Sequence, residues 1–111
     1  MIVSGGVNIY PAEAEQVLID HPAVHDVACI GVPHPEMGEE LVALVQATDP
    51  DLPLPVDELT ALCRQHLAHY KCPRRIVPWS DLGRNAMGKV NKKSLRAGWT
   101  AGTGAKGDPN P

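Results

Sequence analysis

The sequence contains no phenylalanine, and its only large aromatic side chains are those of two tryptophans and two tyrosines. Eleven prolines are spread over its 111 residues. This composition predicts one domain with a small core interrupted by many turns, because the chain is too short for two independent cores. No apolar run approaches the roughly 18 residues of a membrane-spanning helix, and the first residues do not look like a signal peptide. We therefore expect no transmembrane segment and a cytoplasmic location.

Cysteine is also scarce. Cys29, Cys63 and Cys72 are odd in number and form no Cys-x-x-Cys pair, so we expect reduced thiols that pack as small hydrophobic side chains. Cys63, His66, His69 and Cys72 follow one another at intervals of three. If one helix carries all four, each step turns about 300° around the axis, and the side chains cannot converge on one tetrahedral ion. We therefore expect no metal site.

Charge is distributed unevenly along the chain. Residues 1–70 contain eleven acidic residues and a single arginine, whereas residues 71–96 contain eight basic residues and one aspartate. Such a basic segment creates a local positive potential that attracts phosphate-bearing ligands; the alternative is a solvated basic face. We expect no nucleic-acid binding, because the basic segment lacks interleaved aromatic residues and the acidic remainder repels a polyanion.

Two apolar runs of strand length, Val24 to Val32 and Leu41 to Ala47, predict central strands that pair with each other and are covered on both faces. Arg75 to Trp79 predicts a third strand. Pro78 cannot donate a ladder hydrogen bond, so this strand is expected at an edge or a bulge. The Ser-Gly-Gly at residues 4–6 is typical of a loop.

Apolar residues at helical spacing predict helices from Pro11 to His21, from Val56 to Tyr70 and from Asn91 to Trp99. Together with the strands they predict an α+β fold, in which a small sheet of about three strands is flanked by helices. We place the domain at residues 1–99. Residues 100–111 contain too little apolar surface to order themselves and are predicted to form a tail.

The polar segment from Gly83 to Lys93 contains the most informative candidate for chemistry. Lys89 follows Gly88 at the end of a loop that is expected to project from the domain. A lysine ammonium is a compact cation on a long flexible stem and can reach a carboxylate or a phosphate. The segment is not a P-loop, because the earlier glycine and the following Ser or Thr are missing. From composition alone, a basic turn before a helix is the simpler interpretation.

Two segments together carry a family resemblance. MIVSGGVNIYPAEAE (residues 1–15) and GRNAMGK (residues 83–89) resemble signatures of the adenylate-forming acyl-CoA ligases. Between them, HPAV (residues 21–24), IGVP (30–33), GE (38–39) and YKCPR (70–74) occur in the family's order. The resemblance covers about residues 1 to 97. It implies the small, mobile C-terminal domain of an acyl-CoA synthetase, whose expected substrate is a fatty or other carboxylic acid.

The resemblance implies a division of labour with a large N-terminal domain, which this chain lacks and which binds ATP, its Mg²⁺ and the carboxylic acid. The small domain alternates between two poses. In the first pose, Lys89 is the catalytic residue: it stabilises charge on the carboxylate and the α-phosphate while acyl-adenylate and pyrophosphate form. Arg84, Asn85 and Gly88 are expected to support its loop. Gly83 stands where the family commonly has proline, so we expect a less rigid loop.

In the second pose, the resemblance implies contacts with CoA, whose thiol attacks the acyl-adenylate. Gly5 and Gly6 are expected to line the pantetheine passage, where bulky side chains would not fit. Arg64 matches a position that in some relatives approaches the CoA 3′-phosphate; an exposed helix arginine without a role is the alternative.

Two hypotheses about the chain as a whole follow. The first is that it is a fragment of an acid–thiol ligase, inactive without the large domain, because it begins just after the position of the family's hinge residue. The second is a free-standing docking or regulatory module that binds a partner domain or CoA.

Overall fold

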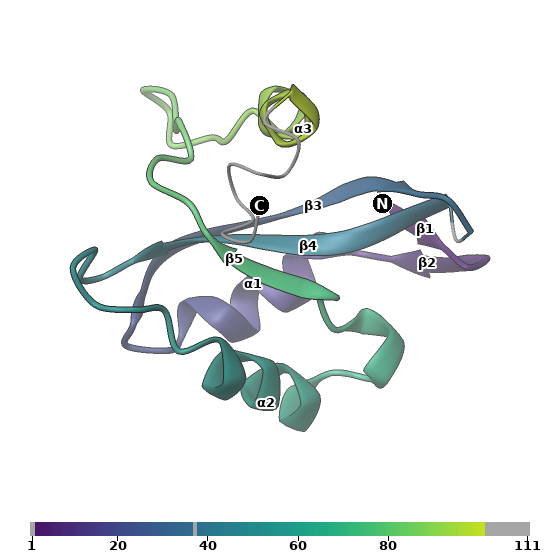
Figure 1. Ribbon diagram of the computed structural model, residues 1–111, viewed down its shortest axis with the longest axis horizontal. Coiled ribbons are helices and arrows are strands. Elements are labelled where there is room, and N and C mark those ends of the chain that lie inside the picture. The colour runs from purple at the N-terminus through teal and green to yellow at the C-terminus, as the bar shows by residue number, and fades with distance from the viewer. Residues whose placement is uncertain (1, 37, 102–111) are drawn as a thin grey trace.

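Two long antiparallel strands form the centre of the structure. The computed structural model describes residues 2–36 and 38–101, and within them β3 (Val24–His34) pairs with β4 (Gly38–Ala47) along nearly their whole length. Helices lie on both faces of the sheet that these strands build (Figure 1). The predicted pairing of the two apolar runs and the α+β class are confirmed. Both runs were predicted to be central strands, which is correct for β4 and wrong for β3, because β3 pairs with β4 alone among the described strands and lies at an edge of the sheet.

The sheet has five strands, whereas the sequence predicted about three. The two that were missed are β1 (Ile2–Ser4) and β2 (Val7–Ile9), which form a hairpin and join the sheet where Ser4 pairs with Gly38 of β4. Strands of three residues are too short to show an alternating pattern, so the sequence revealed only the turn between them.

The last strand, β5 (Arg75–Pro78), runs parallel to β4 and pairs with no other strand of the described residues. It therefore lies at an edge of the sheet, as Pro78 predicted. The backbone N–H of Trp79 continues the contact by donating to the Val45 carbonyl at 2.9 Å.

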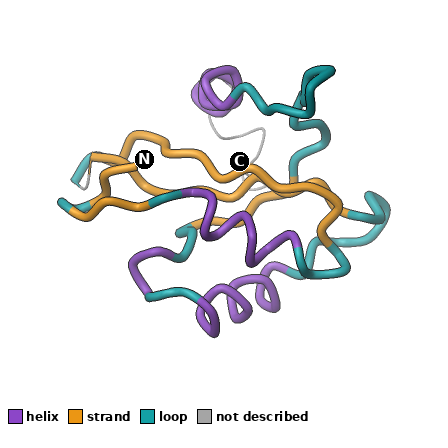
Figure 2. Tube along the Cα trace, turned by 180° about the vertical axis from the view of Figure 1, so that it is seen from behind, coloured by secondary structure: helices purple, strands orange, loops and turns teal. Residues whose placement is uncertain are grey.

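Each face of the sheet has its own core. On one face, α1 (Pro11–Ile19) and α2 (Val56–His66) cover the strands, and on the other face α3 (Lys92–Ala101) covers them (Figures 1 and 2). Successive side chains of a strand point to opposite faces, so alternate residues of β3 and β4 enter the two cores. The first core takes Val27, Cys29, Leu41, Ala43 and Val45, and the second takes Ala28, Ile30, Val32, Val42 and Leu44.

The predicted second helix ends earlier than expected. α2 stops at His66, Leu67 is extended, and His69–Lys71 forms a short 3₁₀ helix, η1. The prediction to Tyr70 was wrong because Leu67 and Tyr70 keep a helical spacing although the backbone has left the helix. The argument against a metal site assumed that one helix carries Cys63, His66, His69 and Cys72. This assumption is wrong, because His69 and Cys72 lie beyond the end of α2. Within residues 2–36 and 38–101, no group of three or more His, Cys, Asp or Glu side chains is arranged to hold a metal ion.

The third helix follows its sequence signals more closely. The side chain of Asn91 accepts the backbone N–H of Ser94 at 3.1 Å and thereby caps α3. The helix continues to Ala101, two residues into the predicted tail; residues 102–111 lie outside the described residues. Trp99 is buried in the second core and stacks on Trp79, with 6.5 Å between the ring centroids.

All three cysteines are free thiols, and Cys29 and Cys63 are buried in the first core, as expected. Burial raises the pKa of the Cys29 thiol far above its usual range and that of Cys63 to about 11. Both thiols are therefore protonated near neutral pH and unreactive. None of the described helices is both long and apolar enough to cross a membrane.

Ion pairs join the acidic first part of the chain to the basic second part. Four bases of residues 71–96 bind acids of α1, β3 or β4, and these bonds leave the other four bases without an ion pair among the described residues. The pairs are Lys71–Glu13, Arg75–Glu40, Arg84–Asp26 and Lys92–Glu15. The positive potential expected from the sequence is therefore partly neutralised within the fold.

The two-core arrangement makes a testable prediction about stability. Leu59 of α2 is fully buried in the first core, so Leu59→Ala should lower the free energy of unfolding by about 2–5 kcal/mol through the cavity it leaves. Leu52 is 63% exposed, and Leu52→Ala should change stability by less than about 0.5 kcal/mol. Urea unfolding of this chain measures both values, and equal effects of the two variants would contradict the assignment of Leu59 to the core.

Candidate functional site

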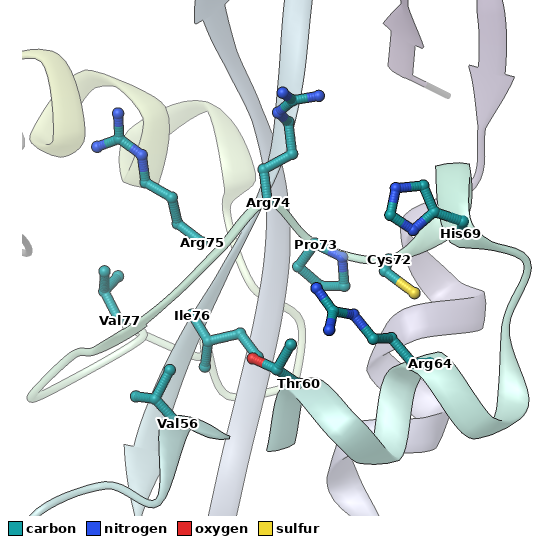
Figure 3. A pocket seen from close by; sticks show the side chains of 10 residues that line it. All are labelled: Val56, Thr60, Arg64, His69, Cys72, Pro73, Arg74, Arg75, Ile76 and Val77. Atoms are coloured by element: carbon teal, nitrogen blue, oxygen red, sulfur yellow. The ribbon is translucent and has the colours of Figure 1, made fainter. Parts of the chain in front are cut away.

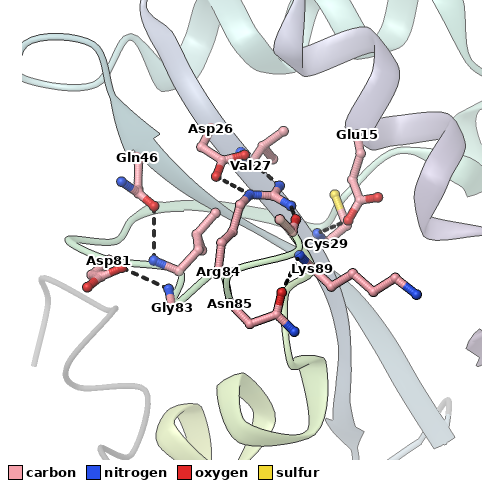
Figure 4. Close-up of polar contacts among 12 residues, drawn as sticks. Glu15, Asp26, Val27, Cys29, Gln46, Asp81, Gly83, Arg84, Asn85 and Lys89 are labelled. Carbon is pink, nitrogen blue, oxygen red and sulfur yellow. Dashed lines mark hydrogen bonds and ion pairs between the residues drawn. The ribbon is translucent and has the colours of Figure 1, made fainter.

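Lys89 ends a compact turn between β5 and α3, on the face of the sheet that α3 covers (Figures 1 and 4). Asn85 closes this turn, which we call the lysine turn (residues 85–89). Its side-chain oxygen accepts the backbone N–H groups of Met87 at 2.9 Å and Lys89 at 3.0 Å. Its backbone N–H donates to the Lys89 carbonyl, and its carbonyl accepts from Gly88, both at 2.9 Å. The turn is therefore internally closed.

Gly88 has a φ of 81°, which side chains rarely adopt. An added Cβ atom would meet nothing within 4 Å. The position therefore needs glycine for its backbone conformation and not for lack of space.

Arg84 connects the lysine turn to the sheet. Its guanidinium binds both carboxylate oxygens of Asp26 on β3, with Nε 2.5 Å from Oδ2 and Nη2 2.7 Å from Oδ1. Its third contact is from Nη1 to the Gly88 carbonyl at 2.6 Å. The hydrogen bond from Arg84 holds the pKa of Asp26 below its usual value, although partial burial acts in the opposite direction. The same bond raises the pKa of Arg84.

The start of the loop is also held. Leu82 is buried in the second core, and its backbone N–H donates to Gln46 Oε1 at 2.9 Å. The N–H of Gly83 donates to Asp81 Oδ1 at 2.8 Å (Figure 4). Gly83 has a φ of 69°, which a proline ring cannot adopt, so a proline here would require a different path of the loop. These hydrogen bonds offset the flexibility that the sequence predicted at Gly83.

The Lys89 side chain itself is exposed and makes no hydrogen bond or ion pair with any other residue that the structure describes. Its ammonium is therefore a free cation on a backbone that is firmly held. Such an arrangement suits a group that has to reach an anionic ligand on another surface.

Gly5 and Gly6 form the two-residue turn of the β1–β2 hairpin. Their φ values are 59° and 82°, the signature of a type I′ turn, and Ser4 pairs with Val7 across it. An added Cβ at Gly6 would meet nothing within 4 Å. At Gly6, glycine is thus needed for the turn and not to avoid crowding within this chain.

Arg64 lines a groove of about 610 Å³ between α2, η1 and the beginning of β5. We call it the arginine groove; Thr60, Arg64, His69 and Arg74 are among its polar lining residues (Figure 3). The guanidinium groups of Arg64 and Arg74 make no hydrogen bond or ion pair with the rest of the described chain. The sequence singled out Arg64 but not Arg74 or His69, because only the fold brings the segment after η1 beside α2.

The structure does not unite all the residues that the sequence singled out. It brings Arg84, Asn85, Gly88 and Lys89 together in one place. The β1–β2 hairpin lies at the other end of the sheet from the lysine turn (Figures 1 and 2). Since β2 contacts η1, the hairpin and the arginine groove are neighbours. The domain thus has two separate candidate regions.

Known proteins resemble the chain over most of its length. Residues 13–89 match the family model described as the AMP-binding enzyme C-terminal domain. The chain is 39% identical over 101 residues to the long-chain-fatty-acid–CoA ligase FadD13 of Mycobacterium tuberculosis. The aligned region covers 91% of this chain and 20% of the ligase.

Solved structures agree. A fatty acyl CoA synthetase of Mycobacterium tuberculosis superposes with a TM-score of 0.82 at 39% identity, covering 91% of this chain and 20% of that one. The o-succinylbenzoate CoA synthetase MenE of Bacillus subtilis, in complex with its acyl-adenylate intermediate, gives 0.77 at 38% identity over 86% of this chain and 19% of that one. The chain spans about a fifth of the length of these proteins.

The Asp26–Arg84 pair predicts a pH dependence of stability. Because the folded-state pKa of Asp26 is depressed, the pair stabilises the fold above the unfolded-state pKa of about 3.9, and this stabilisation is lost as the pH falls through the lower folded-state value. Asp26→Asn should therefore be less stable than the parent chain at pH 7, and the difference should shrink below about pH 4. Urea unfolding at several pH values measures it, with Asp51→Asn as the control for loss of a carboxylate. A difference that stays constant down to pH 2 would contradict the prediction.

Proposed function

The chain belongs to the AMP-binding enzyme C-terminal domain family, and from this membership we propose that it is the lysine-bearing domain of an ATP-dependent acyl-CoA ligase. The resemblance predicted from the sequence motifs is confirmed. In our proposal the ligase activates a carboxylic acid, specifically a fatty acid, as its acyl-adenylate and then transfers the acyl group to CoA. The observation that carries the proposal is the free ammonium of Lys89 on a turn bonded to the sheet.

In the first half-reaction, a carboxylate oxygen of the acid attacks the α-phosphorus of ATP and pyrophosphate leaves. Negative charge is concentrated on the carboxylate and the α-phosphate as the new bond forms. A cation placed against these oxygens lowers the barrier through electrostatic stabilisation and positioning. We assign this role to Lys89.

We assign ATP, its Mg²⁺ and the acid mainly to a large domain outside this chain. No cluster of acidic side chains among the described residues is arranged to hold a metal ion. The relatives are about five times as long as the region that this chain matches. We therefore propose that this chain alone does not catalyse the reaction. A cytoplasmic location of the assembled ligase is a separate proposal, which comes from the sequence alone.

In the second half-reaction, the CoA thiol attacks the acyl carbonyl and AMP leaves. We propose that the β1–β2 hairpin, with its Gly5-Gly6 turn, borders the pantetheine passage, and that the arginine groove binds the 3′-phosphate of CoA. The unpaired guanidinium groups of Arg64 and Arg74 support this assignment, because charge-assisted hydrogen bonds to phosphate are strong. The nearness of the hairpin to the groove supports placing both contacts on one ligand.

Lys89→Ala tests the proposed catalytic role. In the ligase that contains this domain, the variant should slow pyrophosphate release from ATP and a fatty acid by about 100- to 1,000-fold, because a charge-stabilising group is lost. Thioester formation from CoA and supplied acyl-adenylate should continue at the normal rate. Lys93→Ala serves as the matched control, since Lys93 is also exposed and makes no ion pair with the other residues described here. This chain alone, measured in parallel, should release no pyrophosphate. An unchanged rate in Lys89→Ala would leave docking on a partner as the better account of the domain.

Arg64→Ala tests the proposed phosphate contact. The unmodified ligase should have a higher KM for 3′-dephospho-CoA than for CoA. Arg64→Ala should raise the KM for CoA by about tenfold or more and abolish this discrimination, because the loss of one charged hydrogen bond is of this size. Arg96→Ala is the control, and steady-state kinetics give the KM of each of the three enzymes for both thiols. If Arg64→Ala still discriminates between the two thiols, the groove does not bind the 3′-phosphate.

A further inference from the structure

Arg84 makes two hydrogen bonds to the carboxylate of Asp26, a residue that the sequence motifs did not indicate. We propose that Asp26 is a positioning residue for adenylate formation, which acts on Lys89 through Arg84 and the Gly88 carbonyl. This inference rests on the proposed role of Lys89 and adds to it a residue of β3 that lies 58 positions from Arg84 in the sequence.

Arg84 contacts both the sheet and the lysine turn. One guanidinium makes three hydrogen bonds, two to the carboxylate of Asp26 and one to the carbonyl of Gly88. A guanidinium is planar and its N–H groups point in fixed directions, so the position of the carboxylate determines the position of that carbonyl. The Gly88 carbonyl belongs to the peptide group whose N–H is that of Lys89. The contact therefore places the backbone of Lys89 relative to β3.

Asp26 is itself held in place. Its Oδ1 accepts the backbone N–H of Val27 at 2.9 Å, and only 19% of its side chain is exposed. The pairing of β3 with β4 is irregular between Val24 and Asp26, and such irregularities turn a side chain away from its regular direction. A carboxylate that is fixed in this way can serve as a reference point for the loop.

A second contact between the sheet and the loop lies beside the first. Asp26 pairs across the sheet with Gln46, and Gln46 Oε1 accepts the N–H of Leu82. Two neighbouring side chains on adjacent strands therefore hold the loop at Leu82 and at Arg84. Asn85 then closes the lysine turn from within. The sheet thus determines the position of the backbone from which the Lys89 side chain extends. This position matters because a shift of about 1 Å in a reacting group can lower the rate about 100-fold.

The proposal predicts an effect on only one half-reaction. Lys89 serves adenylate formation in our proposal, so loss of the Asp26 contact should lower the kcat of pyrophosphate release and leave the KM for the acid nearly unchanged. Thioester formation from supplied acyl-adenylate should be unaffected. A merely structural role would instead lower both half-reactions together.

The experiment compares variants of the ligase that contains this domain. Asp26→Asn removes the charge and should reduce pyrophosphate release by about 10- to 100-fold. Arg84→Lys keeps the positive charge but cannot make the paired hydrogen bonds of a guanidinium to the carboxylate. It should reduce pyrophosphate release to a similar extent. Asp26→Glu retains a carboxylate and should recover part of the rate. Glu13→Gln is the matched control, because it breaks a 3.0 Å ion pair with Lys71 that lies away from the lysine turn.

A second measurement does not depend on activity. In ¹⁵N-labelled chain, Asp26→Asn should shift the amide signals of Gly88 and Lys89 and speed their hydrogen exchange, whereas Glu13→Gln should not. If Asp26→Asn and Arg84→Lys both keep the normal pyrophosphate release while Lys89→Ala loses it, the positioning role is overturned and the function of Lys89 stands. Equal losses in both half-reactions also overturn the positioning role. A normal rate in Lys89→Ala overturns the proposed function itself, and the positioning role with it.

Discussion

Burial of β3 and β4 on both faces is the constraint from which the rest of the domain follows. Their apolar side chains point alternately into two cores, and neither face can remain exposed to water without a large loss of hydrophobic stabilisation. α1 and α2 precede β5 in the sequence and cover the first face. The chain that follows β5 passes to the second face, where α3 covers it. The segment that makes this passage contains the lysine turn. The position of Lys89 is therefore a consequence of how the sheet is covered.

The uneven distribution of charge along the sequence allows its two parts to bind each other, which the composition did not indicate. Acids of the first part of the chain meet bases of the second part in four ion pairs between elements that are distant in sequence. Partly exposed ion pairs contribute only about 0–1 kcal/mol each, so their main effect here is on position. They connect η1, β5, the loop between β5 and α3, and α3 itself to the rest of the fold. The cations that remain unpaired include Lys89, Arg64 and Arg74, the groups to which we assign ligand contacts.

The two candidate regions lie apart, and in the proposed function this separation has a chemical meaning. The lysine turn serves adenylate formation, and the hairpin with the arginine groove serves CoA. In our proposal the first half-reaction takes place at the carboxylate and the α-phosphate and the second at the acyl carbonyl, and each needs a different region of the domain at the active site. We propose that the domain changes its pose between the two steps, as the family resemblance implied. Rigid attachment of each region to the sheet then lets one movement exchange both sets of contacts.

The sequence by itself determined the elements that are long or strongly patterned, and the residues that belong to local motifs. The apolar runs of β3 and β4, the proline at the beginning of α1 and the edge position of Pro78 could be read in this way, because each depends on neighbouring residues. Lys89, Asn85 and Gly88 lie within five residues of one another and were found from their motif. The short strands β1 and β2 and the end of α2 were missed, because three residues carry no period and Leu67 continues one that the backbone has left.

Only the tertiary structure decided which distant residues complete the sites. Asp26 and Gln46 hold the loop between β5 and α3 through residues that are 58 and 36 positions away in the sequence, and Arg74 and Arg64 line one groove. Nothing in the local sequence marks these partners, because an aspartate on a strand or an arginine after a turn has the same local preferences whether it faces water or another element. Their roles arise when the sheet brings separate segments within hydrogen-bonding distance, and that distance is a property of the fold.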